Sequence, residues 1–165
     1  MRRLPLIIAA VGLLLVIAAP MVAGDTSNEF KASLNGYLET PSISTTARGT
    51  FRATIHGSSS ITYRLTFNDL TTPTLFSHIH FGRPDVAGGV AAFLCGGGSK
   101  PACPASGTVT GTIVPADVIG PTGQGIAPGE FAELMRAMRN GATYVNVHSA
   151  MFPTGEIRGN IHRDD

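Results

Sequence analysis

The sequence predicts an all-β protein, an antiparallel β-sandwich or flattened barrel of about eight strands with one short helix. Apolar and polar residues alternate in most segments after residue 30, which is the period of a strand with one buried face. The chain has 20 glycines among 165 residues, and abundant glycine suits short strands joined by tight turns. A single segment, Glu130 to Arg139, has helical spacing.

The amino terminus is typical of a secretory signal peptide. Arg2 and Arg3 form a basic start, residues 4–19 are almost wholly apolar, and small residues follow at Ala23 and Gly24. The apolar run of about 16 residues is shorter than the roughly 20 that a membrane-spanning helix needs. We therefore expect a signal peptide that is cleaved rather than an uncleaved anchor, and no stable membrane anchor after cleavage.

We accordingly divide the chain into a signal peptide at residues 1–24, a flexible lead-in at 25–29 and one folded domain at 30–163. A domain of this length can bury a core of its own without relying on disulfides. The formal net charge is +1, and two of the basic residues fall in the signal peptide, so the folded domain is close to neutral. Because nucleic-acid binding calls for a basic patch, we expect no nucleic-acid partner.

The expected strands come in chain order, and two hairpins are the clearest among them. Alternating segments at 51–56 and 61–68 flank a Gly-Ser-Ser-Ser connection. A second pair at 144–149 and 156–162 flanks the turn sequence Phe-Pro-Thr-Gly. The other expected strands are residues 30–38, 77–81, 90–94 and 108–113.

The expected helix has one apolar stripe. Phe131, Leu134, Met135 and Met138 fall at the i, i+3, i+4 and i+7 positions, and an Asn-Gly pair at 140–141 supplies the stop signal. We interpret the two methionines as core residues packed against the sheet rather than as metal ligands.

The chain contains two cysteines, Cys95 and Cys103. They bracket a Gly-rich loop that has no apolar residues to hold it in place. An isolated pair in an exported protein usually forms a disulfide, so we expect this one. The alternative, a soft-metal thiolate site, is disfavoured outside the cytoplasm.

Three of the expected strands place charged or imidazole side chains on one face. Since alternate side chains of a strand share a face, His78 and His80 point the same way and lie opposite Ile79. The same rule pairs Asn146 with His148, and Glu156 with Arg158. Three imidazoles on neighbouring strands would bind copper or zinc. The candidate site therefore has His78, His80, His148 and Glu156 as metal ligands, with Arg158 and Asn146 as their supporting neighbours.

Alternative interpretations of the same residues remain open. A buried hydrogen-bond network among them would specify the fold without binding anything. The face could also contact an extracellular protein or a glycan. Neither a Ser-His-Asp arrangement nor a phosphate-binding loop is legible, so the sequence offers no catalytic residues and favours a non-enzyme. If a metal does bind, its affinity is expected to fall below a pH of roughly 6.5, because imidazole binds metal when neutral.

Five short motifs together resemble the CHRD domain, which is named from chordin and also occurs as a single exported unit in bacteria. The resemblance covers residues 30–162 and implies a secreted, periplasmic or cell-envelope module rather than a particular activity. The chain differs from the usual pattern in its added cystine loop and in having Ser149 where Thr is usual. The motifs are Ser-Leu-Asn-Gly-Tyr-Leu-Glu-Thr-Pro at 33–41, Thr-Ala-Arg-Gly at 46–49, His-Ile-His-Phe-Gly at 78–82, Tyr-Val-Asn-Val-His at 144–148 and Gly-Glu-Ile-Arg-Gly-Asn-Ile at 155–161.

A second resemblance is to the copper half of copper/zinc superoxide dismutase, in which a His-x-His strand and a distant histidine lie on a β-sandwich. His78, His80 and His148 have this arrangement. The chain lacks a histidine soon after His80 to act as the bridging ligand, and it lacks the zinc-loop histidines. A secreted binding or structural module with a bound transition metal is therefore our first expectation, and a copper-dependent redox enzyme is the alternative.

Overall fold

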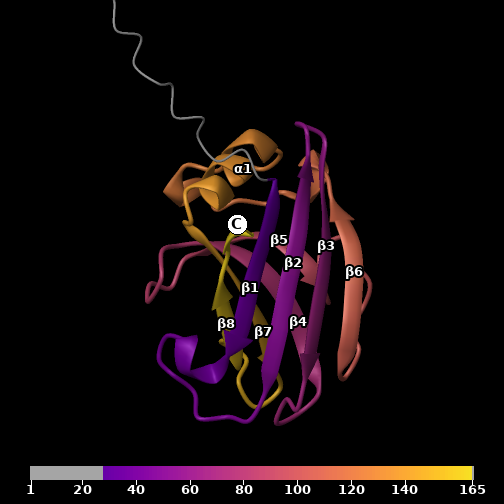
Figure 1. Cartoon of the computed structure of the whole chain (residues 1–165), viewed down its shortest axis with the longest axis vertical. Helices are drawn as coiled ribbons and strands as arrows, with labels where there is room; N and C mark the ends of the chain where they lie inside the picture. The colour runs from indigo at the N-terminus through magenta and orange to yellow at the C-terminus, as the bar shows by residue number, and fades with distance from the viewer. Residues whose placement is uncertain (1–27, 165) are drawn as a thin grey trace, which may run out of the picture.

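A computed structural model describes residues 28–164, which fold into one antiparallel sheet that curls into a nearly closed barrel (Figure 1). The strands are β1 (Glu29–Asn35), β2 (Arg48–His56), β3 (Ser60–Asn68), β4 (Thr74–Phe81), β5 (Gly89–Cys95), β6 (Gly107–Ile113), β7 (Thr143–Ser149), β8 (Ile157–Asn160) and β9 (His162–Arg163). Their spatial order is β5-β4-β7-β8-β1-β2-β3-β6, with β9 paired to β1. The edge strands β5 and β6 contact each other. The predicted fold class is confirmed.

The core fills the barrel because one side of each strand is apolar. In the β2–β3 hairpin, buried residues such as Phe51 and Leu65 alternate with exposed or half-buried polar ones, as the period of two predicts. The strands β4 and β7 contribute Ile79, Val145 and Val147 to the core, all of them inaccessible to solvent. Their alternate polar residues therefore lie on the outer side of the barrel wall.

Two of the predicted strands are shorter than expected. The strand expected at 30–38 ends at Asn35, because the Asn35 side chain accepts a hydrogen bond from the Tyr37 backbone N–H and starts the 3-10 turn η1 (Gly36–Leu38). The strand expected at 156–162 is divided between β8, which pairs with β7, and β9, which pairs with β1. Ile161 lies between them with its side chain buried in the core.

The helix α1 (Phe131–Arg139) covers one end of the barrel (Figure 1). Its buried residues include Phe131, Leu134, Met135 and Met138, so the predicted apolar stripe and the core role of the methionines are confirmed. The helix begins one residue later than expected because Glu130 is its N-cap. Two further 3-10 turns, η2 (Pro115–Asp117) and η3 (Thr122–Gln124), lie in the connection between β6 and α1.

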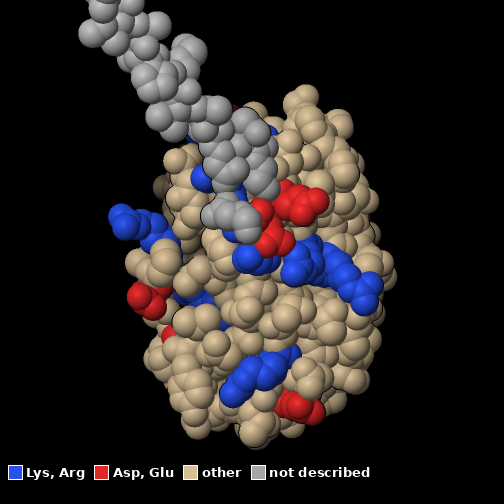
Figure 2. Space-filling model, viewed as in Figure 1, with Lys and Arg blue, Asp and Glu red and all other residues tan. Residues whose placement is uncertain are grey.

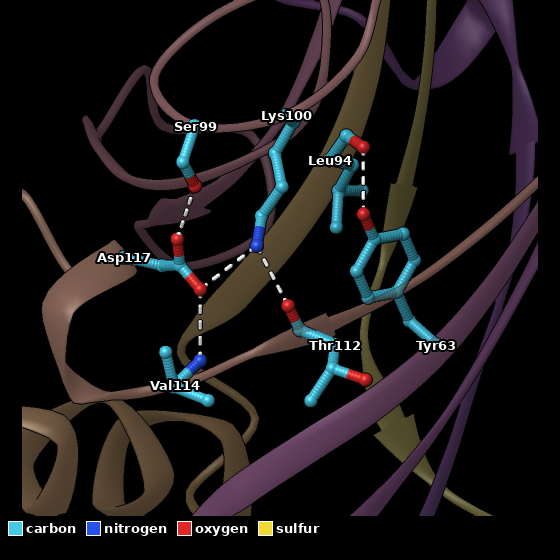
Figure 3. Close-up of polar contacts among 7 residues, drawn as sticks. All are labelled: Tyr63, Leu94, Ser99, Lys100, Thr112, Val114 and Asp117. Atoms are coloured by element: carbon cyan, nitrogen blue, oxygen red, sulfur yellow. Dashed lines mark hydrogen bonds and ion pairs between the residues drawn. The ribbon is translucent and has the colours of Figure 1, made fainter.

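The predicted disulfide between Cys95 and Cys103 is present. Polar contacts of Ser99 and Lys100 fix its loop to the neighbouring segment (Figure 3). The Lys100 ammonium donates to Asp117 Oδ2 at 2.8 Å and to the Thr112 carbonyl at 2.6 Å. Ser99 donates to the other Asp117 oxygen at 2.6 Å. Burial acts to raise the pKa of Asp117, but these hydrogen bonds hold it below its ordinary value. The cystine loop is thus held to the end of β6.

The expected signal peptide and most of the expected lead-in lie outside the described residues. Within residues 28–164, no helix is both long and apolar enough to cross a membrane. The strand β1 begins at Glu29, the last residue of the segment predicted as a lead-in.

Basic and acidic side chains lie close together on the outer face of β1, β2 and β3 (Figure 2). Lys31 on β1 and Arg52 on β2 are cross-strand partners, and both form ion pairs with Asp164 at 2.5 Å. This carboxylate relieves the repulsion between two cations that face each other in register.

Candidate metal centre

The outer faces of β4, β7 and β8 are covered by connecting segments. Every residue of β7 is buried, including the polar residues of its outer face. Backbone carbonyls of the 82–88 segment accept hydrogen bonds from His80 and Arg158, and the 150–156 segment provides one for His148. The candidate site is therefore an enclosed polar layer outside the barrel, not a solvated face.

The structure brings together three of the predicted ligands, His78, His80 and His148. One ring nitrogen from each lies within 4.8 Å of the other two, and all three residues are buried. His78 Nδ1 is 3.2 Å from His148 Nε2. Two ligand nitrogens at 2.0–2.1 Å from one tetrahedral ion lie roughly 3.3 Å apart, so this pair already has the required spacing. Closing the widest pair to that spacing requires a shift of about 1.5 Å at most.

Two backbone carbonyls fix the protonation of the ring nitrogens. His80 Nδ1 is 2.9 Å from the Gly88 carbonyl, and His148 Nδ1 is 3.0 Å from the Pro153 carbonyl. Because a carbonyl only accepts, each Nδ1 carries the proton, and each neutral Nε2 keeps its lone pair. Metal-binding histidines are oriented in this way by hydrogen bonds on their other nitrogen. The lone pair of His80 Nε2 has no hydrogen-bond partner within the described chain.

The three imidazoles are held in the neutral form. Burial lowers the pKa of His78 to about 3, with further lowering from its two histidine neighbours. Burial also lowers the pKa of His148 to about 4 and lowers that of His80. Neutral imidazole is the metal-binding form, so proton competition begins well below the pH of 6.5 expected from the sequence.

Aromatic rings wall the triad, and strand register puts them there. Phe76 is the cross-strand partner of His148, and its ring centroid lies 4.6 Å from that of His148 and 4.9 Å from that of His78. Phe93 is the partner of His78 on the other side, with ring centroids 4.4 Å apart. These rings exclude water from the imidazoles, which strengthens electrostatic interactions at the site.

Arg158 packs on a tyrosine ring that also contacts the triad. Its guanidinium carbon is 3.4 Å from the centroid of the Tyr144 ring, and the same ring stacks on His80 with centroids 4.7 Å apart. The guanidinium donates to the carbonyls of Arg83 and Val86 at 3.0 Å. With 1% of its surface exposed, Arg158 ties the covering segment to β8.

Glu156, predicted as a ligand, is not brought into the histidine group. Its Oε1 accepts hydrogen bonds from Thr45 Oγ1 at 2.8 Å and from the Thr71 backbone and hydroxyl at 2.9 and 2.7 Å. Burial acts to raise the pKa of Glu156, but hydrogen bonds from Ser149, Thr71 and Thr45 hold it below the ordinary value. The Glu156 carboxylate thus links the segment that follows β3 to the segment that follows η1.

The carboxylate next to the site is that of Glu39. Alternation along a strand does not identify this residue, and in the sequence its place beside Pro41 fits a turn-capping role. Glu39 is 8% exposed and interacts with Asn146 and Arg158. Burial raises the pKa of Glu39 to about 7, although Arg158 and hydrogen bonds from Thr40 and Asn146 lower it. The one signal in the sequence was its place in the Tyr-Leu-Glu-Thr-Pro motif.

Asn146, predicted as a supporting residue, lies between this carboxylate and the histidines. Its Oδ1 is 2.9 Å from His148 Nε2, and its Nδ2 lies on the side of Glu39. His78 is its cross-strand partner on β4. The arrangement offers three imidazole nitrogens and one amide oxygen to a cation.

Comparison with known families gave one match. The family model of the CHRD domain matches residues 30–161, which is nearly the whole described chain. The comparisons with curated proteins and with solved structures gave no match.

Proposed function

Because this chain belongs to the CHRD domain family, we propose that it is an exported binding module that holds one transition-metal ion on His78, His80 and His148. Membership of the family supports a binding or structural module. The histidine group supports the finer statement that the ligand is a metal. The Cys95–Cys103 disulfide is compatible with an oxidising compartment outside the cytoplasm.

The observation that carries the proposal is the unpartnered Nε2 of His80. A buried nitrogen without a hydrogen bond costs about 1–3 kcal/mol, so a purely structural network would be expected to satisfy it. His80 instead has its proton on Nδ1 and a free lone pair on Nε2, and it belongs to a close group whose other two members are also neutral imidazoles. A bound cation would satisfy all three lone pairs at once.

Imidazole ligands suit copper and zinc among the common transition metals. When bound, such an ion would supply a fixed positive charge and Lewis acidity at this point of the fold. The chain's own residues orient the ligands through Gly88 and Pro153 and exclude water with Phe76 and Phe93.

No feature of the site favours the dismutase alternative. The two remaining histidines, His56 and His162, are exposed. Neither belongs to the histidine group, so among the described residues there is no second histidine site to bridge to. A superoxide-consumption assay of copper-loaded protein is the direct check, and we expect no more activity than the metal-free protein gives.

Calorimetric titration of chelator-treated protein with Zn²⁺ and Cu²⁺ tests the proposal. The wild type should bind one ion, and a His78→Ala/His80→Ala variant should lose this binding. A His56→Ala/His162→Ala variant removes the same number of histidines from exposed positions and should bind like the wild type. Equal binding by all three proteins, or none by the wild type, would leave the hydrogen-bond network as the better explanation.

A further inference from the structure

We propose that Asn146 Oδ1 is the fourth ligand of the metal and that Glu39 orients the Asn146 amide for this purpose. This inference rests on the proposed function, because it concerns the same ion. It makes the site a closed set of three nitrogens and one oxygen drawn from two adjacent strands.

Strand geometry supports the fourth position. His78 and His80 are two positions apart on β4, with one residue between them, and Asn146 and His148 have the same spacing on β7. Since alternate residues of a strand share a face, each pair points outward from the barrel. His78 and Asn146 are cross-strand partners, so the two pairs lie side by side. Three of these four residues already form the histidine group.

The contact between Asn146 and His148 points to a cation. Asn146 Oδ1 is 2.9 Å from His148 Nε2. The proton of neutral His148 is on Nδ1, where it is donated to the Pro153 carbonyl. The two facing atoms are therefore both acceptors, and they repel each other unless a positive charge lies near both. Ligand atoms around one tetrahedral ion lie about 3.3 Å apart, which is close to the observed spacing.

Glu39 determines which end of the amide faces the histidines. The Asn146 amide nitrogen lies on the side of the Glu39 carboxylate, since both border the place that a Cβ at Gly155 would occupy. The amide oxygen faces His148 Nε2 and the amide nitrogen faces Glu39, which is the orientation that an ionised carboxylate favours because it only accepts. Glu39 thus acts through Asn146 and is a positioning residue, not a ligand.

The backbone makes room for this pair at Gly155. A Cβ at Gly155 would lie 2.5 Å from Glu39 Oε1 and 2.9 Å from Asn146 Nδ2, and the residue has a φ of +130°. Both features require glycine here. Gly155 therefore allows the Glu39 carboxylate to reach Asn146 in a space that any side chain would fill.

Four protein ligands leave no open position, and this is the arrangement of structural zinc sites. The expected occupant is a divalent ion with a tetrahedral preference, with Zn²⁺ as the first candidate. A closed site would stabilise the domain rather than perform chemistry on a small molecule.

The test compares Zn²⁺ affinity, by competition with a chelator, in the wild type and in variants at the two residues. Asn146→Ala should weaken binding by about 10- to 100-fold. Asn146→Asp retains an oxygen donor and should recover most of the affinity, which also guards against an alanine variant that fails to fold. Asn68→Ala, at an exposed asparagine, should bind like the wild type.

The role of Glu39 is tested by a double-mutant cycle. Glu39→Met should weaken Zn²⁺ binding in the wild type by about 10-fold, and it should have no further effect in the Asn146→Ala background. The absorption of the Co²⁺-substituted proteins reports coordination directly. The wild type should give the intense bands of a four-coordinate ion, and Asn146→Ala should change them.

The outcomes separate the two proposals. If Asn146→Ala binds as tightly as the wild type with an unchanged Co²⁺ spectrum, the amide is not a ligand, although the histidine site stands. If Glu39→Met weakens binding equally in both backgrounds, Glu39 does not act through Asn146. If the wild type itself binds no ion, the proposed function fails, and the fourth-ligand proposal fails with it.

Discussion

Single residues in the covering segments hold the histidines in place, and Gly88 is the clearest case. Its carbonyl is 2.9 Å from His80 Nδ1, and its N–H donates to the Tyr144 hydroxyl at 3.1 Å. The backbone of this one residue therefore fixes both the tautomer of His80 and the position of the Tyr144 ring that stacks on it. A Cβ at Gly88 would lie 1.9 Å from the Phe81 carbonyl oxygen, so the covering segment packs this closely only because residue 88 is glycine.

We predict that Gly88→Ala lowers the free energy of unfolding of the metal-free protein by about 1–3 kcal/mol, because the segment must move to relieve the overlap. The same shift should weaken metal binding by misplacing the acceptor of His80. Urea unfolding and Zn²⁺ titration measure the two effects. Gly123→Ala is the matched control, since a Cβ there meets nothing within 4 Å, and it should change neither quantity. A Gly88→Ala protein with wild-type stability would show that the segment adjusts at no cost.

Alternation along a strand identified the three histidines because it depends only on neighbours in the chain. It could not distinguish the two glutamates. Glu156 and Arg158 were expected to share a face with the histidines, but the Glu156 carboxylate bonds to Thr45 and Thr71 instead. Glu39 follows the η1 turn, and its position depends on how a loop folds back over β7 and β8. No local pattern determines that path.

At the scale of elements, the cystine loop supports one wall of the site. A Cβ at Gly97 would lie 2.3 Å from the Phe93 ring, so the loop backbone rests directly on this ring. Phe93 in turn packs edge-on against His78. The Lys100–Asp117 ion pair holds the loop against the barrel (Figure 3). The disulfide holds it as well.

We predict that a Cys95→Ala/Cys103→Ala variant loses about 2–3 kcal/mol of unfolding free energy through the greater entropy of its unfolded chain. Its metal affinity should also fall, because Phe93 loses its support. Urea unfolding and Zn²⁺ titration of the variant check these effects, and the substitution is preferable to a thiol reductant, which would itself bind metal. A variant with reduced stability but wild-type affinity would show that Phe93 holds its place without the loop.

For the whole molecule, the sequence predicted the hairpins but not the order of the sheet. The β2–β3 and β7–β8 neighbours were read from alternation on either side of a turn. The neighbours β4–β7, β1–β8 and β3–β6 are distant in the chain, and the packing of the whole core selects them. The site depends on this order, because β4 and β7 together carry all three histidines.

The whole molecule also determines how the metal-free protein responds to acid. The unfolded state of a histidine titrates near pH 6.5, whereas the pKa values of His78 and His148 are lowered to about 3 and 4 and that of His80 is lowered. Between pH 6.5 and 4 the unfolded state therefore binds up to three more protons than the native state. Stability rises with pH wherever the unfolded state binds more protons. The three histidines therefore lower the free energy of unfolding as the pH falls.

Glu39 acts in the opposite direction. Its pKa rises from 4.5 to about 7 on folding, so between these values the native state binds one more proton. The stability contributed by protonated Glu39 is complete below pH 4.5 and is lost as pH rises through about 7. From pH 6.5 to 4.5 the three histidines outweigh this single group, and the net slope is no more than about 3 kcal/mol per pH unit.

We therefore predict that the metal-free protein loses stability as the pH is lowered from 6.5 to 4.5, and that a Glu39→Gln variant loses it more steeply because the opposing group is gone. Urea unfolding of chelator-treated protein at several pH values measures both slopes. The zinc-loaded protein should resist unfolding better than the metal-free protein at pH 7, since an ion bound only by the native state stabilises it by mass action. This advantage should persist to about pH 4 and shrink below it, where protons begin to compete for His148 in the native protein. A metal-free protein whose stability is constant across this range would mean that the histidines are not buried in neutral form, and the ligand set would then lack the lone pairs that the metal site requires.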